Sequence, residues 1–580
     1  MCGINGIISH NWRIQPERFN KVRDTLKHRG PDGASSWFSD DGHVAFGHRR
    51  LSFLDLSDNG RQPMSNEDGK IWMTFNGEIY NYLELKQLLQ EKGHVFKSQT
   101  DSEVIIHGWE EWGESVLNRL EGMFAFAIWD EKEKTLFLAR DRFGIKPLYY
   151  QPGKEVFFFG SELKAIIAHP AVVRELDITA VCDYLVYRYV PSPKTIWKGI
   201  NKLPPAHCLK WKRGEWPQIR KYWELGNQFI DSNPEECISK VDQMLESSVK
   251  NHIRSDVPIG AFLSGGYDSS ALVYYMTKVG TSPNSFSIGF SNWQETEHQY
   301  ARVVADHLNV PNFATIMEGE SLDLVEDLVY HFDEPLADIS IIPTYQVSKL
   351  ARQHNKAVLS GEGADELFIG YNWTKEIALQ NGSLKGSSGL VEQYAKAMAM
   401  GRFTTKELNY LIHPDFYDQI PGDPEWFYRQ QVQSGMPALK TFQYLDIHTF
   451  MSELVLTKVD RASMANSLEV RVPFLDHKLV EYLYSFNKKT IFRKSTQKFL
   501  LNRILKPVLP QTILNRKKQG FVGPDHYYAN FGWFASVLFE GRLLKDEIIQ
   551  KSMLKVYFDQ RDTWRLWKLA VLELWWQKWM

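Results

Sequence analysis

A cysteine at position two is the first candidate nucleophile of this 580-residue chain. If Met1 is removed, the Cys2 thiol stands beside a free α-amino group, whose pKa of about 7.7 to 8.0 leaves part of it neutral near pH 7. One residue then supplies both a nucleophile and a base. The alternative is a buried cysteine that serves as a small hydrophobic residue, the commoner use of cysteine. The residues that accompany Cys2 therefore decide between the two interpretations.

Five residues between positions 50 and 101 could bind a small zwitterion that carries an amide side chain. Arg50 could pair with its carboxylate, and Glu78 and Asp101 could hold its ammonium group. Asn76 and Gly77 could form an oxyanion hole. Taken singly, each is more often a turn residue or a surface charge. The set as a whole favours a glutamine-like substrate beside Cys2.

A second candidate site begins at the segment 263–270, LSGGYDSS, which follows an apolar run and precedes a helical window. Glycines let the backbone approach a phosphate, and a helix N-terminus offers unpaired N–H groups. The segment lacks the Gly-Lys-Ser/Thr ending of a P-loop, so a P-loop lysine is not expected to grip the phosphates. Asp268 suits Mg²⁺, because a carboxylate with phosphate oxygens fits that cation. The alternative is a glycine turn in which Asp268 or Ser269 caps the helix.

A similar segment, SGEGADE at 360–366, follows another apolar run. In an open parallel sheet the carboxyl ends of the strands form the ligand crevice. We therefore expect the two Ser-Gly segments to face each other, with Asp268 and Asp365 sharing a metal ion. Glu362 could act in proton transfer.

The elements that would position these residues change character along the chain. Residues 1 to about 200 are rich in short apolar runs between Gly, Asn and Asp turns, with a helical window at 81–92, and predict strands. Apolar runs at 257–263, 285–290 and 357–359 alternate with helical windows and predict a parallel sheet with crossover helices. The helix after the second run has apolar positions at Tyr300, Val303, Val304 and Leu308.

The domain boundary is expected in the proline-rich stretch 191–234, which shows little periodicity. We place two domains at 1–210 and 211–580. Residues after about 380 look mainly helical, and we expect most of the tryptophans of the C-terminal tail to pack in the core at helical spacing.

Composition excludes several classes of protein. The chain has 68 Lys and Arg and 70 Asp and Glu, a net charge of −2, so no strong field is available for nucleic acid or an acidic membrane. No apolar stretch approaches the roughly 20 residues of a membrane span, and no signal peptide is recognised. Four cysteines without metal-binding spacing are expected in a reducing cytoplasm.

The motifs of the first 170 residues resemble a known family. MCGI, KHRGPDG, GHRRLS, NGEIYNY, SQTDSEV, GMFAFAIWD and ARDRFGIKPLYY are similar to the N-terminal-nucleophile glutaminase domain of glutamine-dependent amidotransferases, in the arrangement of asparagine synthetases. The resemblance implies stacked antiparallel sheets flanked by helices. It also implies that glutamine is hydrolysed to glutamate and ammonia through a Cys2 thioester, with Asn76 and Gly77 catalytic and Arg50, Asn76, Gly77, Glu78 and Asp101 binding glutamine.

The later motifs extend the resemblance to about residue 525. SGGYDSS is similar to the pyrophosphate loop of enzymes that split ATP to AMP and pyrophosphate, on an α/β domain with a helical C-terminal extension. The resemblance implies that ATP and Mg²⁺ adenylate a carboxylate, which internally delivered ammonia then attacks. It assigns Glu362 as the base, Asp268 and Asp365 to metal, and ATP binding to Leu263, Ser264, Gly265, Gly266, Asp268, Ser269, Ile288, Ser360, Gly361 and Lys458.

Two positions depart from the usual pattern of the family. Tyr267 stands where leucine is usual, and Ile369 stands where glycine is usual. Neither change removes a catalytic group, but either could reshape the pocket of the acceptor. The acceptor is expected to be aspartate, with a sugar uronic acid or a natural-product intermediate as the alternative. A third interpretation, a silent scaffold, is disfavoured because Cys2, Asn76, Asp268, Glu362 and Asp365 are all present. The resemblance also suggests a homodimer.

Overall fold

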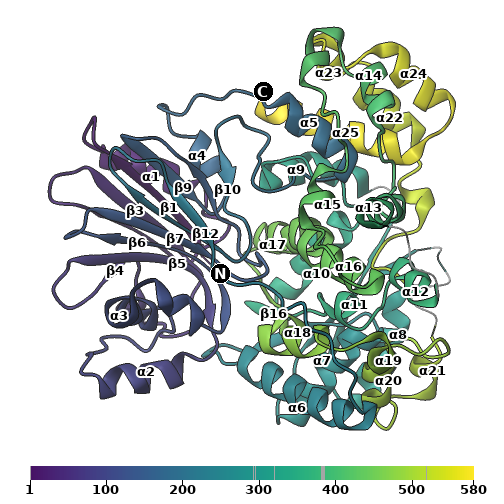
Figure 1. Cartoon of the computed structure of the whole chain (residues 1–580), viewed down its shortest axis with the longest axis horizontal. Helices are drawn as coiled ribbons and strands as arrows, with labels where there is room; N and C mark the ends of the chain where they lie inside the picture. Colours follow the sequence, from purple (N-terminus) through teal and green to yellow (C-terminus); the bar gives the residue numbers. More distant parts are fainter. Residues whose placement is uncertain (1, 292, 294–295, 319–320, 381–385, 517–518) are drawn as a thin grey trace.

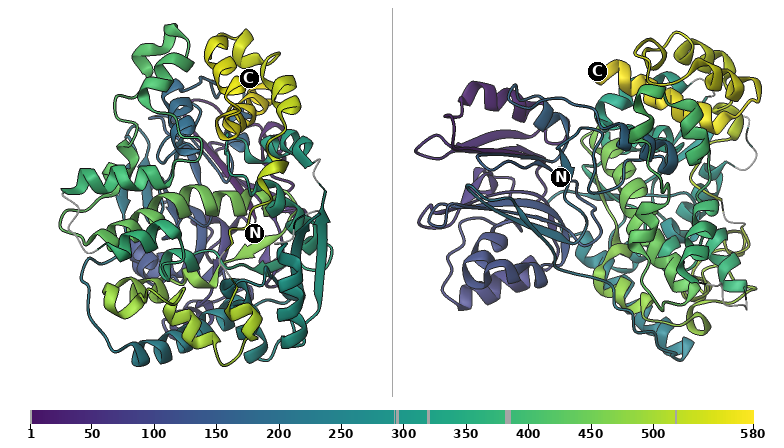
Figure 2. Two further views of the ribbon diagram at one scale, coloured as in Figure 1. Left: turned by 90° about the vertical axis from the view of Figure 1, so that its right-hand side faces the viewer. Right: turned by 45° about the horizontal axis from the view of Figure 1, so that its top comes forward.

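The computed structural model describes residues 2–580 except 292, 294–295, 319–320, 381–385 and 517–518. Two halves lie side by side, a β-rich N-terminal half and a largely helical C-terminal half (Figure 1). The right-hand view of Figure 2 shows the same division, with the sheets of the first half beside the helices of the second. This arrangement confirms the predicted order of an α+β domain followed by an α/β domain.

The first half contains two six-stranded antiparallel sheets. One has the order β10-β8-β9-β1-β3-β2 and the other β12-β11-β7-β6-β5-β4. Side chains such as Ile4, Phe46, Ala127 and Leu138 fill the space between the sheets. The strands are β1 (Gly3–Ser9), β2 (Gly33–Phe38), β3 (Val44–Arg50), β4 (Met64–Ser65), β5 (Ile71–Ile79), β6 (Gly122–Asp130), β7 (Thr135–Arg140), β8 (Tyr149–Gln151), β9 (Val156–Gly160), β10 (Asn201–Lys202), β11 (His207–Lys212) and β12 (Gln218–Lys221).

Helices cover the outer faces of both sheets. On the second sheet, α2 (Tyr82–Glu91) and α3 (Glu103–Trp112) pack Leu89 and Ile105 against strand residues such as Phe75. On the first sheet, α1 (Pro16–Asp24) and α4 (Lys164–Ile167) bury Phe19 and Ile166. The alternation of apolar residues along the strands builds this four-layer sandwich, because successive side chains point to opposite faces.

The second half is built on a five-stranded sheet of order β15-β14-β13-β16-β17 in which every pairing is parallel. Its strands are β13 (Ile259–Phe262), β14 (Ser285–Phe290), β15 (Asn312–Met317), β16 (Ala357–Leu359) and β17 (Glu469–Arg471). Later strands add on both sides of β13, so the order reverses between β13 and β16. A ligand crevice is expected outside the carboxyl ends of two such strands.

Helices α6 (Pro234–His252), α7 (Tyr267–Lys278), α8 (Glu297–Leu308), α9 (Leu324–Phe332) and α10 (Ile341–Arg352) accompany this sheet. The chain beyond residue 370 is mainly helical, which includes the part after about residue 380 that was predicted to be so. Its longer helices are α12 (Asn372–Leu379), α13 (Gly386–Ala397), α14 (Thr405–Leu411), α16 (Ala438–Leu445), α17 (Leu456–Met464), α18 (His477–Tyr484), α20 (Phe499–Leu505), α22 (Phe531–Leu538), α24 (Lys551–Asp559) and α25 (Thr563–Trp579).

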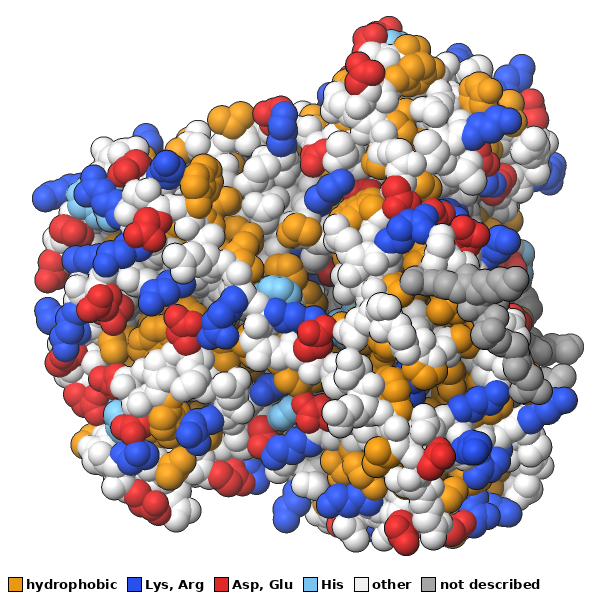
Figure 3. All heavy atoms as spheres, viewed as in Figure 1, with side chains coloured by type: hydrophobic (Ala, Val, Ile, Leu, Met, Phe, Trp, Pro, Cys, Tyr) orange, Lys and Arg blue, Asp and Glu red, His pale blue; other side chains and the backbone are white. Residues whose placement is uncertain are grey.

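The tryptophan-rich tail forms α25, which is buried on most of its surface. Trp567, Trp575 and Trp576 are at most 2% exposed, as predicted from helical spacing. Lys568 on the same helix is also buried and donates to the carbonyl of Leu185 at 2.7 Å. Among the described residues, no helix is both long and apolar enough to cross a membrane. The face shown in Figure 3 intersperses acidic and basic side chains.

Candidate functional site

Cys2 lies directly before β1 and is held from two sides. Its backbone nitrogen donates to Asn76 Oδ1 at 2.8 Å, and its Sγ lies 3.9 Å from the carbonyl oxygen of Leu51. Arg29 Nε donates to the Cys2 carbonyl at 3.1 Å. Burial raises the pKa of the Cys2 thiol above its ordinary value. A base beside Cys2 is therefore needed to generate the thiolate, which is the nucleophilic form.

Asn76 and Gly77 lie near the end of β5, next to Cys2. The Nδ2 of Asn76 is buried and has no acceptor among the described residues. A buried donor without a partner is costly, so it is well suited to receive a ligand oxygen. A side chain at Gly77 would lie 2.1 Å from the carbonyl oxygen of Met123, so only glycine permits this approach of β5 to β6. The pair thus has the features of an oxyanion hole.

The predicted carboxylates converge on the same strand end. Asp101 Oδ2 accepts a hydrogen bond from Ile79 N at 2.7 Å, and burial raises its pKa to about 6. Burial also raises the pKa of Glu78 well above its ordinary value. Arg471 lies with Nη2 3.1 Å from Glu78 Oε1 and partly opposes that rise. A ligand ammonium group would relieve both buried carboxylates.

Arg50 ends β3 and is anchored by backbone carbonyls. Its guanidinium donates to the carbonyl oxygens of Ser57 at 2.9 Å and Asp55 at 2.5 Å. A side chain at Gly60 would lie 2.2 Å from Arg50 Nη2, so this glycine makes room for the guanidinium. Arg50 is therefore held in place by the 54–60 loop before any substrate binds.

The segment 263–270 joins β13 to α7 at the predicted crevice. Ser264 N donates to Ser269 Oγ at 3.1 Å, and Gly266 N donates to Ser264 Oγ at 3.3 Å. Gly265 has a φ of +71°, and a side chain there would lie 2.5 Å from Tyr300 Cβ. Glycine is therefore required both by the backbone conformation and by the neighbouring helix.

The two Ser-Gly segments meet, as expected from the sheet order. A side chain at Gly361 would lie 2.9 Å from Asp268 Cβ. Lys498 places its Nζ 2.6 Å from Asp268 Oδ1 and 2.8 Å from Asp365 Oδ1. Two carboxylates thus converge on one cation, and an all-oxygen donor set of this kind fits Mg²⁺.

The surroundings of the remaining predicted residues differ. Leu263 and Ile288 are 1% exposed, and Ser360 N donates to the carbonyl of Arg471 at 2.9 Å. Glu362 buries its Oε2 without a hydrogen-bond donor among the described residues. Lys458, on α17, donates from Nζ to Ser340 Oγ at 3.0 Å.

Comparisons with known protein families match both halves of the chain. A glutamine amidotransferase domain model matches residues 1–223, and an asparagine synthase model matches residues 240–579. The chain belongs to the asparagine synthase family. It is 33% identical to asparagine synthetase [glutamine-hydrolyzing] 1 of Bacillus subtilis (strain 168), over 99% of this chain and 96% of that protein.

Two further relatives span most of the chain. A putative asparagine synthetase of Mycobacterium bovis is 33% identical over 87% of this chain and 84% of its own length. Amidase chry2 of Gibberella zeae is 28% identical over 91% of this chain and 90% of its own length. The chain is thus also similar to a protein whose name is not that of an asparagine synthetase.

Three charged residues of this family member were missed by the sequence analysis. Lys498 joins the two aspartates, Arg516 Nη1 donates to the carbonyl of Ser264 at 2.9 Å, and Arg471 reaches Glu78. Each lies more than 130 residues away in sequence from the partners named here. No spacing rule connects residues so far apart, so only the fold could reveal them.

The two positions that depart from the family pattern, Tyr267 and Ile369, have different structural roles. The hydroxyl of Tyr267 bonds to the carbonyl of Leu514 at 2.5 Å and accepts from Asn502 Nδ2 at 2.9 Å. It ties α7 to the helical extension. Ile369 is 1% exposed and has a φ of +56°, a left-handed conformation that is rare for a β-branched residue. Together with Lys498 it lines a cavity of about 170 Å³.

Proposed function

We propose that the protein is a glutamine-dependent asparagine synthetase. It would hydrolyse glutamine at Cys2, activate the side-chain carboxylate of aspartate with ATP, and transfer ammonia to give asparagine, AMP and pyrophosphate. The observation that carries this proposal is the physical link between the two sites. Arg29 donates both to the Cys2 carbonyl and, at 2.8 and 3.0 Å, to Asp460 of α17.

In the glutaminase half, removal of Met1 would turn the Cys2 nitrogen into a free amine beside Asn76 Oδ1. That amine would accept the thiol proton and later return a proton to the departing ammonia. Asn76 Nδ2 and the Gly77 N–H would hold the oxyanion. Arg50 would bind the carboxylate of glutamine, and Glu78 and Asp101 its ammonium group.

In the synthase half, Leu263, Ser264, Gly265, Gly266, Asp268, Ser269, Ile288, Ser360, Gly361 and Lys458 would bind ATP. Asp268 and Asp365 would hold Mg²⁺, which supplies charge neutralisation at the pyrophosphate. The buried Oε2 of Glu362 would take a proton from ammonia as it adds to the activated carboxylate. Lys498 is proposed in addition, as the cation that faces the same phosphate groups.

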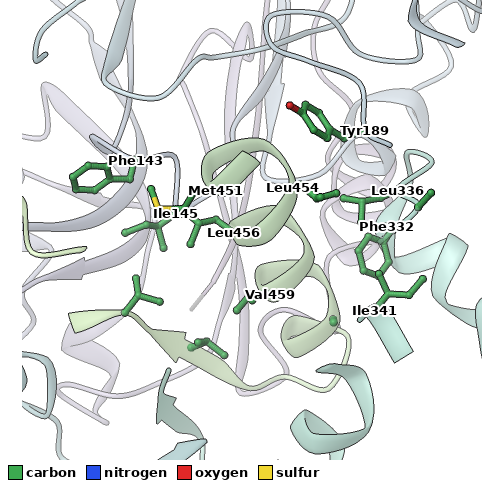
Figure 4. Packing of buried hydrophobic residues seen from close by; sticks show 14 of the residues in the cluster. Phe143, Ile145, Tyr189, Phe332, Leu336, Ile341, Met451, Leu454, Leu456 and Val459 are labelled. Atoms are coloured by element: carbon green, nitrogen blue, oxygen red, sulfur yellow. The ribbon is translucent and has the colours of Figure 1, made fainter. Parts of the chain in front are cut away.

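The boundary between the two halves supports internal transfer of ammonia. Phe143 and Ile145 of the first half group with Met451 and Leu456 of the second, and all four are buried (Figure 4). Apolar walls bind neither ammonium ions nor water strongly, so they favour passage of neutral ammonia.

The first experiment measures pyrophosphate release with ATP, Mg²⁺ and glutamine, with and without aspartate. Strong dependence on aspartate with asparagine as product supports the proposal. Glutamine hydrolysis without aspartate-dependent pyrophosphate would reject aspartate as the acceptor. Cys2→Ala should abolish synthesis from glutamine and retain synthesis from ammonium chloride. A Cys2→Ala enzyme that still used glutamine would contradict the glutaminase assignment.

The alternative is the same chemistry on another carboxylate, such as a sugar uronic acid or a natural-product intermediate. The similarity to an amidase and the isoleucine at position 369 favour testing it. These acceptors would be screened in the same pyrophosphate assay, because the site motifs specify the reaction more closely than the acceptor.

The domain boundary predicted at residue 210 falls within β11, and β12 pairs with β11. We therefore propose that the glutaminase domain continues through Lys221.

We also propose that the protein is a homodimer in the cytoplasm and acts without nucleic acid or membrane partners. Gel filtration with light scattering would test the oligomeric state.

A further inference from the structure

A group of histidine and glutamate side chains lies on the helical side of the second sheet, outside both sites described above. Glu67 comes from the turn between β4 and β5, and His94 from the segment that follows α2. His107 and Glu110 stand on α3 (Figure 1). Ligand atoms of Glu67, His94 and His107 all lie within 4.8 Å of one another. Three separate segments of the chain thus bring metal-binding groups to one point.

The distances approach those of a tetrahedral metal site. His107 Nδ1 lies 3.3 Å from Glu110 Oε2 and 3.8 Å from Glu67 Oε1, and His94 Nδ1 lies 3.9 Å from Glu110 Oε2. Zinc bonds of about 2.0–2.2 Å to nitrogen and oxygen place tetrahedral donors about 3.4 Å apart. Small side-chain movements would therefore close the group around an ion.

The environment of His107 indicates which of its two ring nitrogens faces the group. The ring is 2% exposed, and its Nε2 is buried without a hydrogen bond that meets normal criteria among the described residues. The nearest acceptor of that nitrogen is Glu103 Oε1 at 3.5 Å. A carboxylate on one ring nitrogen keeps the proton there and leaves the other nitrogen free to bind a metal.

The neighbouring carboxylates are themselves oriented. Asn66 Nδ2 donates to Glu110 Oε1 at 2.8 Å, which leaves Oε2 directed to His107. Val95 N donates to Glu67 Oε1 at 3.2 Å. Glu103 accepts from the backbone nitrogens of Lys97 and Ser98 at 2.7 and 2.8 Å. Hydrogen-bonded carboxylates behind the ligands are typical of protein metal sites.

The group also requires a positive charge at its centre. The ring of His107 has carboxylate oxygens of Glu110, Glu103 and Glu67 at 3.3, 3.5 and 3.8 Å. A proton on His107 is thus one way to balance the surrounding carboxylates. A divalent cation bound to the neutral ring is the other, and two imidazoles with two carboxylates suit Zn²⁺.

We propose that Glu67, His94, His107 and Glu110 bind one Zn²⁺ ion. Four protein ligands would close the coordination shell, so the site would be structural and not catalytic. The ion would fasten the β4–β5 turn and the segment after α2 to α3. The proposal is independent of the acceptor and of the synthase reaction.

The test is zinc content and affinity of the full-length protein. Chelator-treated protein would be incubated with Zn²⁺ in excess Mg²⁺, desalted and analysed by plasma mass spectrometry. Glu67→Gln and His94→Asn should each lose one equivalent of zinc and weaken the binding roughly tenfold or more. Both side chains are partly exposed, so the variants should fold, and their circular dichroism and melting temperature without zinc would verify this.

His413→Asn is the matched control, because His413 lies 3.5 Å from the single carboxylate of Asp415, outside the group. It should bind as much zinc as the wild type. Co²⁺ in place of zinc should give a tetrahedral spectrum without a thiolate band, which separates this site from Cys2. Equal zinc content and affinity in the wild type, Glu67→Gln and His94→Asn would overturn the proposal and leave His107 as a protonated ion-pair partner.

Discussion

Arg471, on β17 of the synthase domain, lies 3.1 Å from the carboxylate of Glu78, on β5 of the glutaminase domain. The same guanidinium pairs with Glu469 at 2.5 Å and donates to the carbonyl of His252 at 2.7 Å. Both carboxylates and Arg471 are almost wholly buried. One domain therefore supplies the counter-charge for a proposed glutamine-binding residue of the other.

Arg471→Lys is expected to raise the KM for glutamine roughly tenfold or more, because a hydrogen bond to a charged group contributes about 1.5–3 kcal/mol. Lysine keeps the positive charge but lacks the planar guanidinium group, whose N–H donors bind several partners at once. Pyrophosphate release would be measured with glutamine and with ammonium chloride as nitrogen sources. Arg220→Lys, in an exposed pair with Glu114, should change neither activity. An equal loss with both nitrogen sources would show that Arg471 acts only on the synthase fold.

Asp101 should give glutamine binding a pH dependence. Its pKa of about 6 means that the carboxylate loses its charge as the pH falls through 6, so the KM for glutamine should rise up to tenfold per pH unit below that value. Steady-state glutaminase kinetics between pH 5 and 8 would measure this. Asp101→Asn should have a high KM that does not follow this profile, and an unchanged profile in that variant would assign the titration to another group.

The same shift has a consequence for stability. The ordinary pKa of Asp101 is 3.8, so the native state binds more protons than the unfolded state between about pH 4 and 6. The contribution of Asp101 to stability therefore falls as the pH rises through that window. Asp101→Asn is expected to be more stable than the wild type above pH 6 in urea unfolding. A wild type that remained more stable at pH 7 would contradict the raised pKa.

The sequence predicted the parts of the synthase sheet that have a strong local pattern. The apolar runs became β13, β14 and β16, and the two Ser-Gly segments meet at their ends. β15 and β17 were missed. β15 is an edge strand in which every residue but the last is partly or fully exposed, and β17 has only three residues. Val303, predicted on the buried face of its helix, is 41% exposed. The buried face of α8 is therefore narrower than the spacing of its apolar residues indicated.

The site residues also divide into those within a local sequence motif and those outside any motif. Residues in short motifs, such as Asn76 and Asp268, could be proposed from the sequence, because neighbours in sequence stay neighbours in space. Lys498 and Arg471 were not, because their partners lie far away along the chain. The predicted contact of Lys458 with phosphate stays a prediction, since that lysine bonds to Ser340 in the structure.

Lys498→Gln and Lys458→Gln form a matched pair that separates the two lysines. If Lys498 neutralises phosphate charge, its loss should lower aspartate-dependent pyrophosphate release roughly 10²- to 10³-fold, the effect of removing one electrostatic stabiliser. Glutamine hydrolysis by the first domain should remain and serves as the control for folding. A large loss of pyrophosphate release in Lys458→Gln, with little change in Lys498→Gln, would instead assign the phosphate contact to Lys458.

Ile369 allows a test of backbone strain at the edge of the synthase crevice. At a buried helical position, a variant with glycine is less stable than one with alanine by about 1 kcal/mol. The reason is that glycine loses more conformational freedom on folding. At φ +56° this order should invert, since the left-handed conformation costs a residue with a Cβ atom about 1–2 kcal/mol.

Ile369→Gly should therefore be more stable than Ile369→Ala by up to about 1 kcal/mol, although both remove a buried side chain and both should be less stable than the wild type. Urea unfolding of the two variants would measure the difference. Ile377, buried on α12, provides the comparison, and there the alanine variant should be the more stable one. If alanine were also favoured at position 369, the left-handed conformation would not be strained in solution, and the isoleucine would carry no backbone cost for the pocket that it lines.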